Sequence, residues 1–290
     1  MTIPGFRRDR MRVGDVEVAY ASAGAGPPLL LLHGYPQTHL MWRHVAPALA
    51  RRFTVVAADL RGYGESSKPA GDPDHARYAK RAMADDQVGL MGALGFERFA
   101  VVGHDRGARV AHRMALDHPA AVERLGVLDI VPTRHLFENV DQAFAAAYYH
   151  WFFLIQPDGL PERMIGADPD WFLREILRRW SAIDGAIEEE AVAAYSAAFA
   201  DPAAIHASCE DYRAAASIDL EHDRADAGRL LECPTLVLWG ARGAMGRLYD
   251  VGEIWRAYAA DVTAATVPAG HFVAEEDPAG TLAVLEAFLP

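Results

Sequence analysis

"FAVVGHDRGARVAHRMAL", residues 99–116, is the stretch of the chain that decides its fold. An apolar run, Phe99–Val102, leads into Gly-His-Asp-Arg-Gly, and a segment with helical spacing, Ala108–Leu116, follows at once. This order predicts a strand, a sharp turn and a helix, because a glycine on each side of a strained turn leaves room for it. Asp105 lies at the turn between Gly103 and Gly107. We expect its side chain at the carboxyl end of a sheet, where open α/β sheets place ligands.

The rest of the chain repeats this alternation of short apolar runs and helical segments. Residues Arg8–Val13 and Val16–Ala21 flank Gly14-Asp15 and predict an opening hairpin. Further predicted strands, mostly apolar and bounded by Gly, Pro or charge, are Leu29–Leu32, Thr54–Ala58, Leu125–Ile130, Thr235–Trp239 and a run near Ala264–Val267. Such runs are typical of strands buried on both faces. With helical segments such as Asp85–Leu94 between them, they predict an α/β fold with a mostly parallel sheet.

One long segment, from about Thr133 to Ala215, breaks the rhythm. It is rich in Ala, Trp, Tyr and Phe at helical spacing, as in "AVAAYSAAFA" (191–200), and it shows no convincing strand. We interpret it as a helical cap inserted into the sheet domain. The predicted division is a first core part over 1–132, a cap over 133–215 and a second core part over 216–290.

Composition excludes several classes of protein. The 290 residues are 51% hydrophobic, which allows a sizeable core, and the net charge of −12 argues against a nucleic-acid partner. No apolar run is long enough to span a membrane, and the N-terminus lacks the apolar core of a signal peptide. Cys209 and Cys233 show no metal-ligand or disulfide pattern, so we expect reduced thiols, a cytoplasmic location and no metal or cofactor.

Asp105 occupies the position at which many hydrolases carry a serine, in the pattern G-x-S-x-G. A helix cap would also explain an aspartate here, but the strand, both glycines and the helix together favour a nucleophile. Serine attacking a saturated carbon would leave an inert ether. An ionised aspartate instead leaves an alkyl ester that water can cleave. The sequence therefore indicates an sp³ carbon bearing a leaving group, such as a halide or an epoxide oxygen.

Cleavage of that ester requires a base and a group that orients it. His271, in "VPAGHFVAEEDP" after the last predicted strand, is the expected base. The orienting acid has two candidates. Asp129 lies at the edge of the apolar strand "VLDIVPT", where an unpaired charge would be costly, and Asp250 follows the next predicted strand. We favour Asp129, with Asp250 as the alternative.

The remaining candidates surround the predicted turn. Arg106 and Arg109 lie three residues apart on the helix, so they either neutralise Asp105 or hold a substrate carboxylate. The backbone N–H groups of Tyr35, in "LLLLHGYP", and of Arg106 would form an oxyanion hole. In the cap, the donors His150, Trp151 and Tyr212 could either bind a departing halide or simply form an aromatic core.

These motifs together resemble the haloacetate (fluoroacetate) dehalogenases of the α/β-hydrolase superfamily. The resemblance covers nearly the whole chain and is most specific in "HDRGAR" (104–109), "HW" (150–151) and "CEDYRA" (209–214). It implies an α/β-hydrolase fold, Asp105 as nucleophile, His271 as base and Asp129 as acid. It also implies that Arg106 and Arg109 bind the haloacetate carboxylate, that His150, Trp151 and Tyr212 bind the halide, and that the protein is a homodimer.

Two rival functions fit the same motifs. An epoxide hydrolase would use the same aspartate and usually two cap tyrosines; Tyr148 or Tyr149 could join Tyr212 in that role. A small-molecule receptor on this fold would have no need for an acid–base triad. Arg134, Trp239 and Arg242 receive no role from the sequence.

Overall fold

The computed structural model describes all 290 residues and contains one eight-stranded sheet with the order β1-β2-β4-β3-β5-β6-β7-β8. The strands are β1 (Arg7–Val13), β2 (Val16–Ala23), β3 (Pro28–Leu32), β4 (Thr54–Ala58), β5 (Phe99–His104), β6 (Val122–Leu128), β7 (Thr235–Gly240) and β8 (Val262–Val267). Only β2 runs against its neighbours β1 and β4; every other pair is parallel. The predicted opening hairpin and the mostly parallel α/β sheet are therefore confirmed.

The predicted strand Leu125–Ile130 is wrong at its carboxyl end. Strand β6 stops at Leu128, and Asp129 follows with a left-handed backbone, φ 55°. Its N–H still donates to the carbonyl of Leu238 at 2.8 Å, so the residue stays beside β7 after the strand has ended. An apolar run does not reveal where the backbone leaves the extended conformation.

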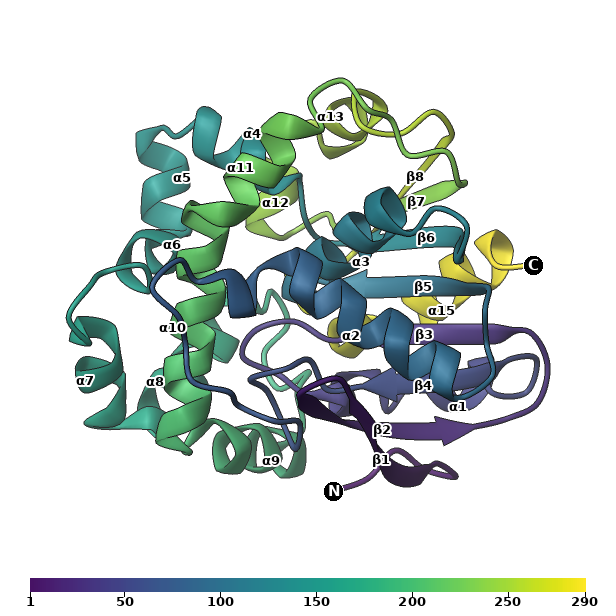
Figure 1. The fold of residues 1–290 in the computed structure, drawn as a ribbon, viewed down its shortest axis with the longest axis horizontal. Coiled ribbons are helices and arrows are strands. Elements are labelled where there is room, and N and C mark those ends of the chain that lie inside the picture. The colour runs from purple at the N-terminus through teal and green to yellow at the C-terminus, as the bar shows by residue number, and fades with distance from the viewer.

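Helices cover both faces of the sheet. Helices α2 (Lys80–Ala93) and α3 (Arg106–Asp117) lie side by side in front of it in Figure 1. The other helices of this part are α1 (Ala46–Leu49), α12 (Ala244–Leu248), α13 (Val251–Arg256), α14 (Val273–Glu276) and α15 (Pro278–Phe288), with 3₁₀ turns at His39–Trp42 and Ala76–Tyr78. No helix has the length and apolar character needed to cross a membrane.

A second group of helices lies between β6 and β7 in the chain. It consists of α4 (Thr133–Glu138), α5 (Gln142–Ala147), α6 (Tyr149–Phe153), α7 (Leu160–Gly166), α8 (Pro169–Trp180), α9 (Glu189–Phe199), α10 (Pro202–Ala216) and α11 (Ile218–Ala225). Figure 1 shows them gathered beside the ends of the parallel strands, with α10 running across the group. This group therefore faces the end of the sheet at which β5 leads into α3.

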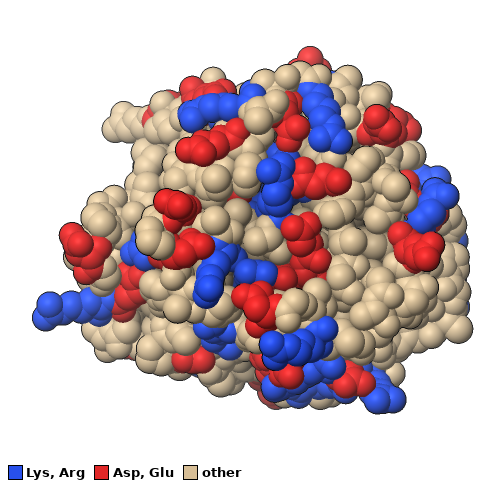
Figure 2. All heavy atoms as spheres, viewed as in Figure 1, with Lys and Arg blue, Asp and Glu red and all other residues tan.

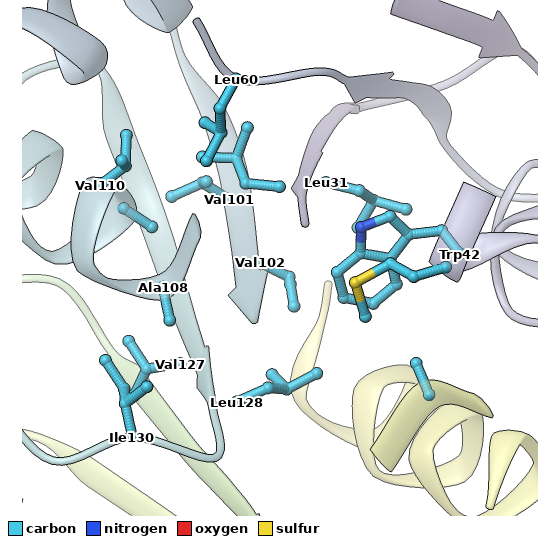
Figure 3. Packing of buried hydrophobic residues seen from close by; sticks show 14 of the residues in the cluster. Leu31, Trp42, Leu60, Val101, Val102, Ala108, Val110, Val127, Leu128 and Ile130 are labelled. Carbon is cyan, nitrogen blue, oxygen red and sulfur yellow. The ribbon is translucent and has the colours of Figure 1, made fainter. Parts of the chain in front are cut away.

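The core fills the space between the sheet and its helices. Figure 3 shows Val101 and Val102 of β5 between the side chains of β3 and β6, with Ala108 and Val110 of α3 on one side. All of these side chains are fully buried. Full burial on both faces is the reason that these strands read as unbroken apolar runs rather than alternating ones. On the face drawn in Figure 2, acidic and basic side chains are intermixed.

The glycines of the turn give a stability prediction. A Cβ on Gly103 would lie 2.4 Å from the carbonyl oxygen of Gly107, and backbone cannot yield as a flexible side chain can. We expect Gly103→Ala to lower the free energy of unfolding by roughly 1–3 kcal/mol or more, measured by denaturant titration. The control is Gly92→Ala in α2, where a Cβ meets nothing within 4 Å. The free energy of unfolding of Gly92→Ala should rise by about 0.5–1 kcal/mol. Equal losses in Gly103→Ala and Gly92→Ala would contradict the argument.

Candidate active site

Asp105 forms the turn between β5 and α3 with an unusual backbone, φ 48° and ψ −114°. A non-glycine residue rarely adopts positive φ, and such strain collects at functional sites. The carboxylate does not cap α3; instead its Oδ1 accepts the backbone N–H of Tyr35 at 2.9 Å. The residue is buried, so the turn presents an acidic group to the interior of the molecule.

His271 lies between two carboxylates. Its Nδ1–H donates to Oδ2 of Asp129 at 2.6 Å, and its Nε2 lies 3.9 Å from Oδ2 of Asp105. Because Nδ1 carries the proton in this arrangement, Nε2 of the neutral ring is free to accept one. Nε2 is buried and has no hydrogen-bond partner.

The geometry separates the two candidates for the orienting acid. Asp129 accepts from the ring of His271 and, through Oδ1, from the N–H of Gly240 at 3.0 Å. Asp250 is exposed and caps α13, with its Oδ1 accepting from the N–H of Glu253 at 3.0 Å. The structure therefore brings Asp129, and not Asp250, to His271.

Charges around the turn set the protonation states. Burial alone would raise the pKa of Asp105, but His271, His104, Arg106 and Arg109 bring it below its usual value. Burial alone would lower the pKa of His271, but the hydrogen bond and charge of Asp129, followed by the charge of Asp105, raise it. At neutral pH, Asp105 is therefore an ionised carboxylate next to an imidazole whose pKa lies above its usual value.

Arg106 is already engaged by a carboxylate that sequence reasoning missed. Its Nε and Nη2 donate to the two oxygens of Asp211 on α10, at 2.9 and 2.7 Å, and Nη2 also donates to the Asp211 carbonyl. Lys80 and the hydroxyl of Tyr63 bind the same carboxylate. The paired donors Nε and Nη2 of Arg106 are therefore occupied by Asp211, and its expected role in binding a substrate carboxylate stays a prediction. Only Nη1, which is buried without a partner, remains available.

Arg109 differs because it forms no ion pair. Its Nη1 donates to the carbonyl of Val131 and the hydroxyl of Thr133, both at 3.0 Å, and its Nε has no partner. The guanidinium lies 4.6 Å from the ring centre of Trp151. Burial and the neighbouring charge of Arg106 lower the pKa of Arg109 to about 10. A buried cation without a carboxylate is costly, so this residue is suited to an anionic ligand.

Three side chains of the helical segment carry further hydrogen-bond donors near Asp105. We call the donors around Asp105 the shell. His150 and Trp151, adjacent on α6, both lie against Tyr212 of α10, with ring centres 5.6 and 5.8 Å away. Tyr212 Oη and His150 Nδ1 are buried without partners. Burial lowers the pKa of His150 to about 3 and raises that of Tyr212, so both stay neutral at physiological pH. The hydroxyl and the neutral imidazole each keep one proton to donate.

The two backbone N–H groups predicted to form the oxyanion hole differ in their hydrogen bonds. The N–H of Tyr35 already binds Asp105, as described above. Arg106 is the first residue of α3, so its N–H has no carbonyl one turn earlier in the helix. The Tyr35 side chain also belongs to the shell: its ring lies 5.5 Å from that of Tyr212, and its buried hydroxyl has no partner.

Sequence reasoning also missed Glu276, which follows His271 closely in the chain. Its carboxylate accepts four backbone N–H groups, from Gly270 and Phe272 beside His271 and from Ala182 and Ile183 after α8. The His271 N–H in turn donates to the carbonyl of Trp180 at 3.0 Å. Glu276 therefore fastens the His271 loop to the end of α8. An acid in "AEEDP" carries no signal of this in the sequence.

The three residues to which the sequence assigns no role lie in different parts of the structure. Arg134 lies over the ring of Tyr258, and Trp239 packs beside Gly246 of α12. Arg242 lines a cavity of about 490 Å³ that His271 also lines. This cavity therefore connects His271 to exposed residues at the surface.

The pair of Asp129 and His271 gives a pH prediction. A histidine with a raised pKa stabilises the folded state below its unfolded pKa of about 6.5, and that contribution is lost as pH rises through the folded value. Asp129→Asn should lower the pKa of His271 and remove this pH-dependent part of the stability. An NMR titration of the His271 ring measures its pKa. Thermal unfolding at pH values below and above that pKa measures the pH-dependent part of the stability. The exposed Asp158→Asn serves as control, and an unchanged His271 pKa in Asp129→Asn would refute the pairing.

Comparisons with known proteins agree with this architecture. The model of the α/β hydrolase fold family matches residues 27–278. The chain is 52% identical over 287 residues to a fluoroacetate dehalogenase from a Burkholderia species, covering 98% of this chain and 94% of that protein. It is 36% identical over 272 residues to a soluble epoxide hydrolase from Corynebacterium sp. strain C12, covering 92% and 91%.

A solved structure of a protein from Nostoc sp. PCC 7120, assigned to the α/β hydrolases, superposes with a TM-score of 0.98 at 55% identity and covers 99% of both chains. The eight-stranded sheet, the family match and the identity across nearly the full length agree with one another. The chain therefore belongs to the α/β-hydrolase fold family and, within it, to the haloacetate dehalogenases, as its similarity to the Burkholderia protein shows.

Proposed function

We propose that this protein hydrolyses short 2-haloacids, such as fluoro-, chloro- and bromoacetate, to a 2-hydroxyacid and halide. One observation carries the proposal: a buried, ionised Asp105 faces a shell of buried donors that have no partner within the protein. These unpartnered atoms are Tyr35 Oη, Arg106 Nη1, Arg109 Nε, His150 Nδ1 and Tyr212 Oη, and the acceptor Nε2 of His271 is also without a partner. Leaving such groups unsatisfied is costly unless a ligand accepts their hydrogen bonds. The relative named as a fluoroacetate dehalogenase supports the same substrate class.

Arg109 is the first binding group for the substrate carboxylate. It forms no ion pair, and its Nε is free, whereas Arg106 has only Nη1 free beside its bond to Asp211. In our proposal one oxygen of the haloacetate carboxylate accepts from each arginine. This grip holds the adjacent carbon against Asp105, which converts a bimolecular attack into a positioned one.

In the first step, Oδ2 of Asp105 attacks the carbon that bears the halogen. The electron pair of the carbon–halogen bond leaves with the halide, and a glycolate ester of Asp105 forms. His150, Trp151 and Tyr212 donate hydrogen bonds to the halide as its charge develops. Because Oδ1 is held by the N–H of Tyr35, Oδ2 is the oxygen left to attack.

In the second step, Nε2 of His271 takes a proton from water, and the resulting hydroxide attacks the Asp105 carboxyl carbon. Negative charge develops on Oδ1, where the N–H groups of Tyr35 and Arg106 form the oxyanion hole. The protonated His271 then protonates the departing alkoxide, so glycolate leaves and one proton is released overall. Asp129 stabilises the imidazolium formed in between.

Three wider predictions accompany this mechanism. We propose that residues 133–215 act as a cap that excludes water from the carbon–halogen bond, with 1–132 and 216–290 as the catalytic core. A homodimer is expected from the resemblance to the family. A cytoplasmic location is expected from the two reduced cysteines.

Trapping the intermediate tests the mechanism directly. With His271→Asn, the ester should form but not be cleaved, because the base is missing. Incubation with chloroacetate should release one equivalent of halide per chain, and mass spectrometry should find one carboxymethyl group on Asp105. Asp105→Asn with His271→Asn is the control and should remain unmodified. An unmodified His271→Asn chain that releases no halide would sink the proposed mechanism.

Substitution of Arg109 tests the carboxylate site. Loss of a charge-assisted hydrogen bond of about 1.5–3 kcal/mol predicts that Arg109→Gln lowers kcat/KM for chloroacetate roughly 10- to 100-fold, mainly through KM. Thermal stability should not fall to the same degree, because the arginine has no carboxylate to lose. Arg163→Gln, an exposed arginine without ion pairs on α7, should behave as the parent protein. Equal kinetics for both variants would exclude Arg109 as the anchor.

Epoxide hydrolysis is the alternative that shares this nucleophile, and it is the named activity of the relative that is 36% identical. Tyr148 is buried, and the charges of Asp129 and Asp105 contribute to its raised pKa, so it is the candidate for a second tyrosine beside Tyr212. Halide release from haloacetates and diol formation from styrene oxide, assayed on the same preparation, separate the two activities.

A further inference from the structure

The cavity next to His271 is built from three separate segments of the chain. They are residues 146–149 around the start of α6, 179–182 at the end of α8, and 242–247 around α12. The cavity has a volume of about 490 Å³, which exceeds the size of a haloacetate. We call it the entrance cavity, because His271 lines it together with exposed side chains.

The charged side chains of the entrance cavity all have one sign. Arg179, Arg242 and Arg247 line it, and no aspartate or glutamate does. Arg179 is paired with Glu175 of its own helix at 3.1 Å. Arg242 and Arg247 form no ion pair; Arg247 donates to the carbonyl of Arg242, which ties the two residues together. Two uncompensated cations therefore stand at the opening.

This local charge opposes that of the whole molecule. The chain has 40 acidic and 28 basic residues, so its net charge of −12 repels small anions from most of its surface. A cleft lined by one sign of charge focuses the field within it and raises the local concentration of the opposite ion. Within about one Debye length of the opening, the charges of Arg242 and Arg247 oppose this repulsion of an approaching anion.

We propose that Arg242 and Arg247 form an outer, anion-attracting site that draws the substrate carboxylate through the entrance cavity toward Arg109 and Arg106. The identity of the anion as a haloacetate rests on the proposed function; the preference for small anions over neutral molecules rests on the cavity alone. The two residues are specificity-determining and not catalytic, because they contact neither Asp105 nor the reacting carbon.

The proposal predicts a particular kinetic pattern. The field of the two arginines acts alike on the bound haloacetate and on the transition state, since both carry the same total charge with Asp105. Such uniform binding changes KM and leaves kcat unaltered. Their loss should therefore lower kcat/KM without lowering kcat, and added salt should narrow the difference by screening the field.

The first experiment measures halide release by Arg242→Gln/Arg247→Gln. We expect kcat/KM for chloroacetate to fall roughly threefold to tenfold at low ionic strength, with kcat retained, and to approach the parent value in concentrated salt. The matched control is Arg12→Gln/Arg163→Gln, which removes two exposed, unpaired arginines from β1 and α7. An equal loss in the control would assign the effect to net charge, and no loss in the first variant would overturn the proposal.

The second experiment does not depend on catalysis. Trp180 lines the entrance cavity, and its fluorescence can be quenched by iodide, an anion, or by acrylamide, which is neutral. The background is Trp171→Phe/Trp239→Phe, because Trp171 is 60% exposed and Trp239 is only partly buried, whereas Trp42, Trp151 and Trp255 are buried. In Arg242→Gln/Arg247→Gln, iodide quenching should weaken at least about twofold at low salt while acrylamide quenching stays constant.

The two experiments separate the two proposals. If the parent protein releases no halide from any haloacetate, the proposed function fails, and iodide quenching still decides whether the entrance cavity collects anions. If the parent protein turns over haloacetate but the variant shows unchanged kcat/KM and unchanged iodide quenching, the outer site is refuted and the proposed function stands.

Discussion

The strained turn at Asp105 is the constraint on which the rest of the site depends. A left-handed φ at a residue with a side chain costs about 1–3 kcal/mol, and it persists only where the surrounding structure enforces it. Here a Cβ on Gly34 would lie 2.4 Å from that of Asp105, and one on Gly107 would lie 2.3 Å from the His33 carbonyl. These close backbone contacts join the loop after β3 to the start of α3. They deliver the Tyr35 N–H to one carboxylate oxygen and leave the other facing His271.

Charge compensation is the second constraint, and it differs between the two buried arginines beside Asp105. Asp211 is held by Arg106, Lys80 and Tyr63, and Lys80 also pairs with Asp219, so these two cations are balanced by two carboxylates within the fold. Arg109 is left with neutral partners beside Asp105. The protein thereby keeps a buried cation and several donors unsatisfied, each at a cost of about 1–3 kcal/mol. A small anion that fills the site removes this cost, which is how stability given up by the empty site becomes binding free energy for the substrate.

The helices beside the sheet are joined to the catalytic loops by a few buried groups. Glu276 binds backbone N–H groups on both sides of His271 and at the end of α8, and His104 donates to the His271 carbonyl at 2.8 Å. Burial lowers the pKa of His104 to about 3, so it acts as a neutral donor. The end of α8, where Trp180 and the entrance cavity lie, is therefore tied by hydrogen bonds to the loop that carries the base.

The sequence by itself determined the sheet, the turn at Asp105 and the set of residue types around it, because those depend on local patterns: apolar runs, glycines at fixed offsets and a helix that follows at once. It also favoured Asp129, since a lone charge in an apolar strand needs a partner. Only the tertiary structure decided the end of β6 at Leu128, the engagement of Arg106 by Asp211 from α10, and the meeting of three distant segments around the entrance cavity. These features depend on contacts between residues far apart in the chain, and no periodicity along the chain records which distant side chains will meet.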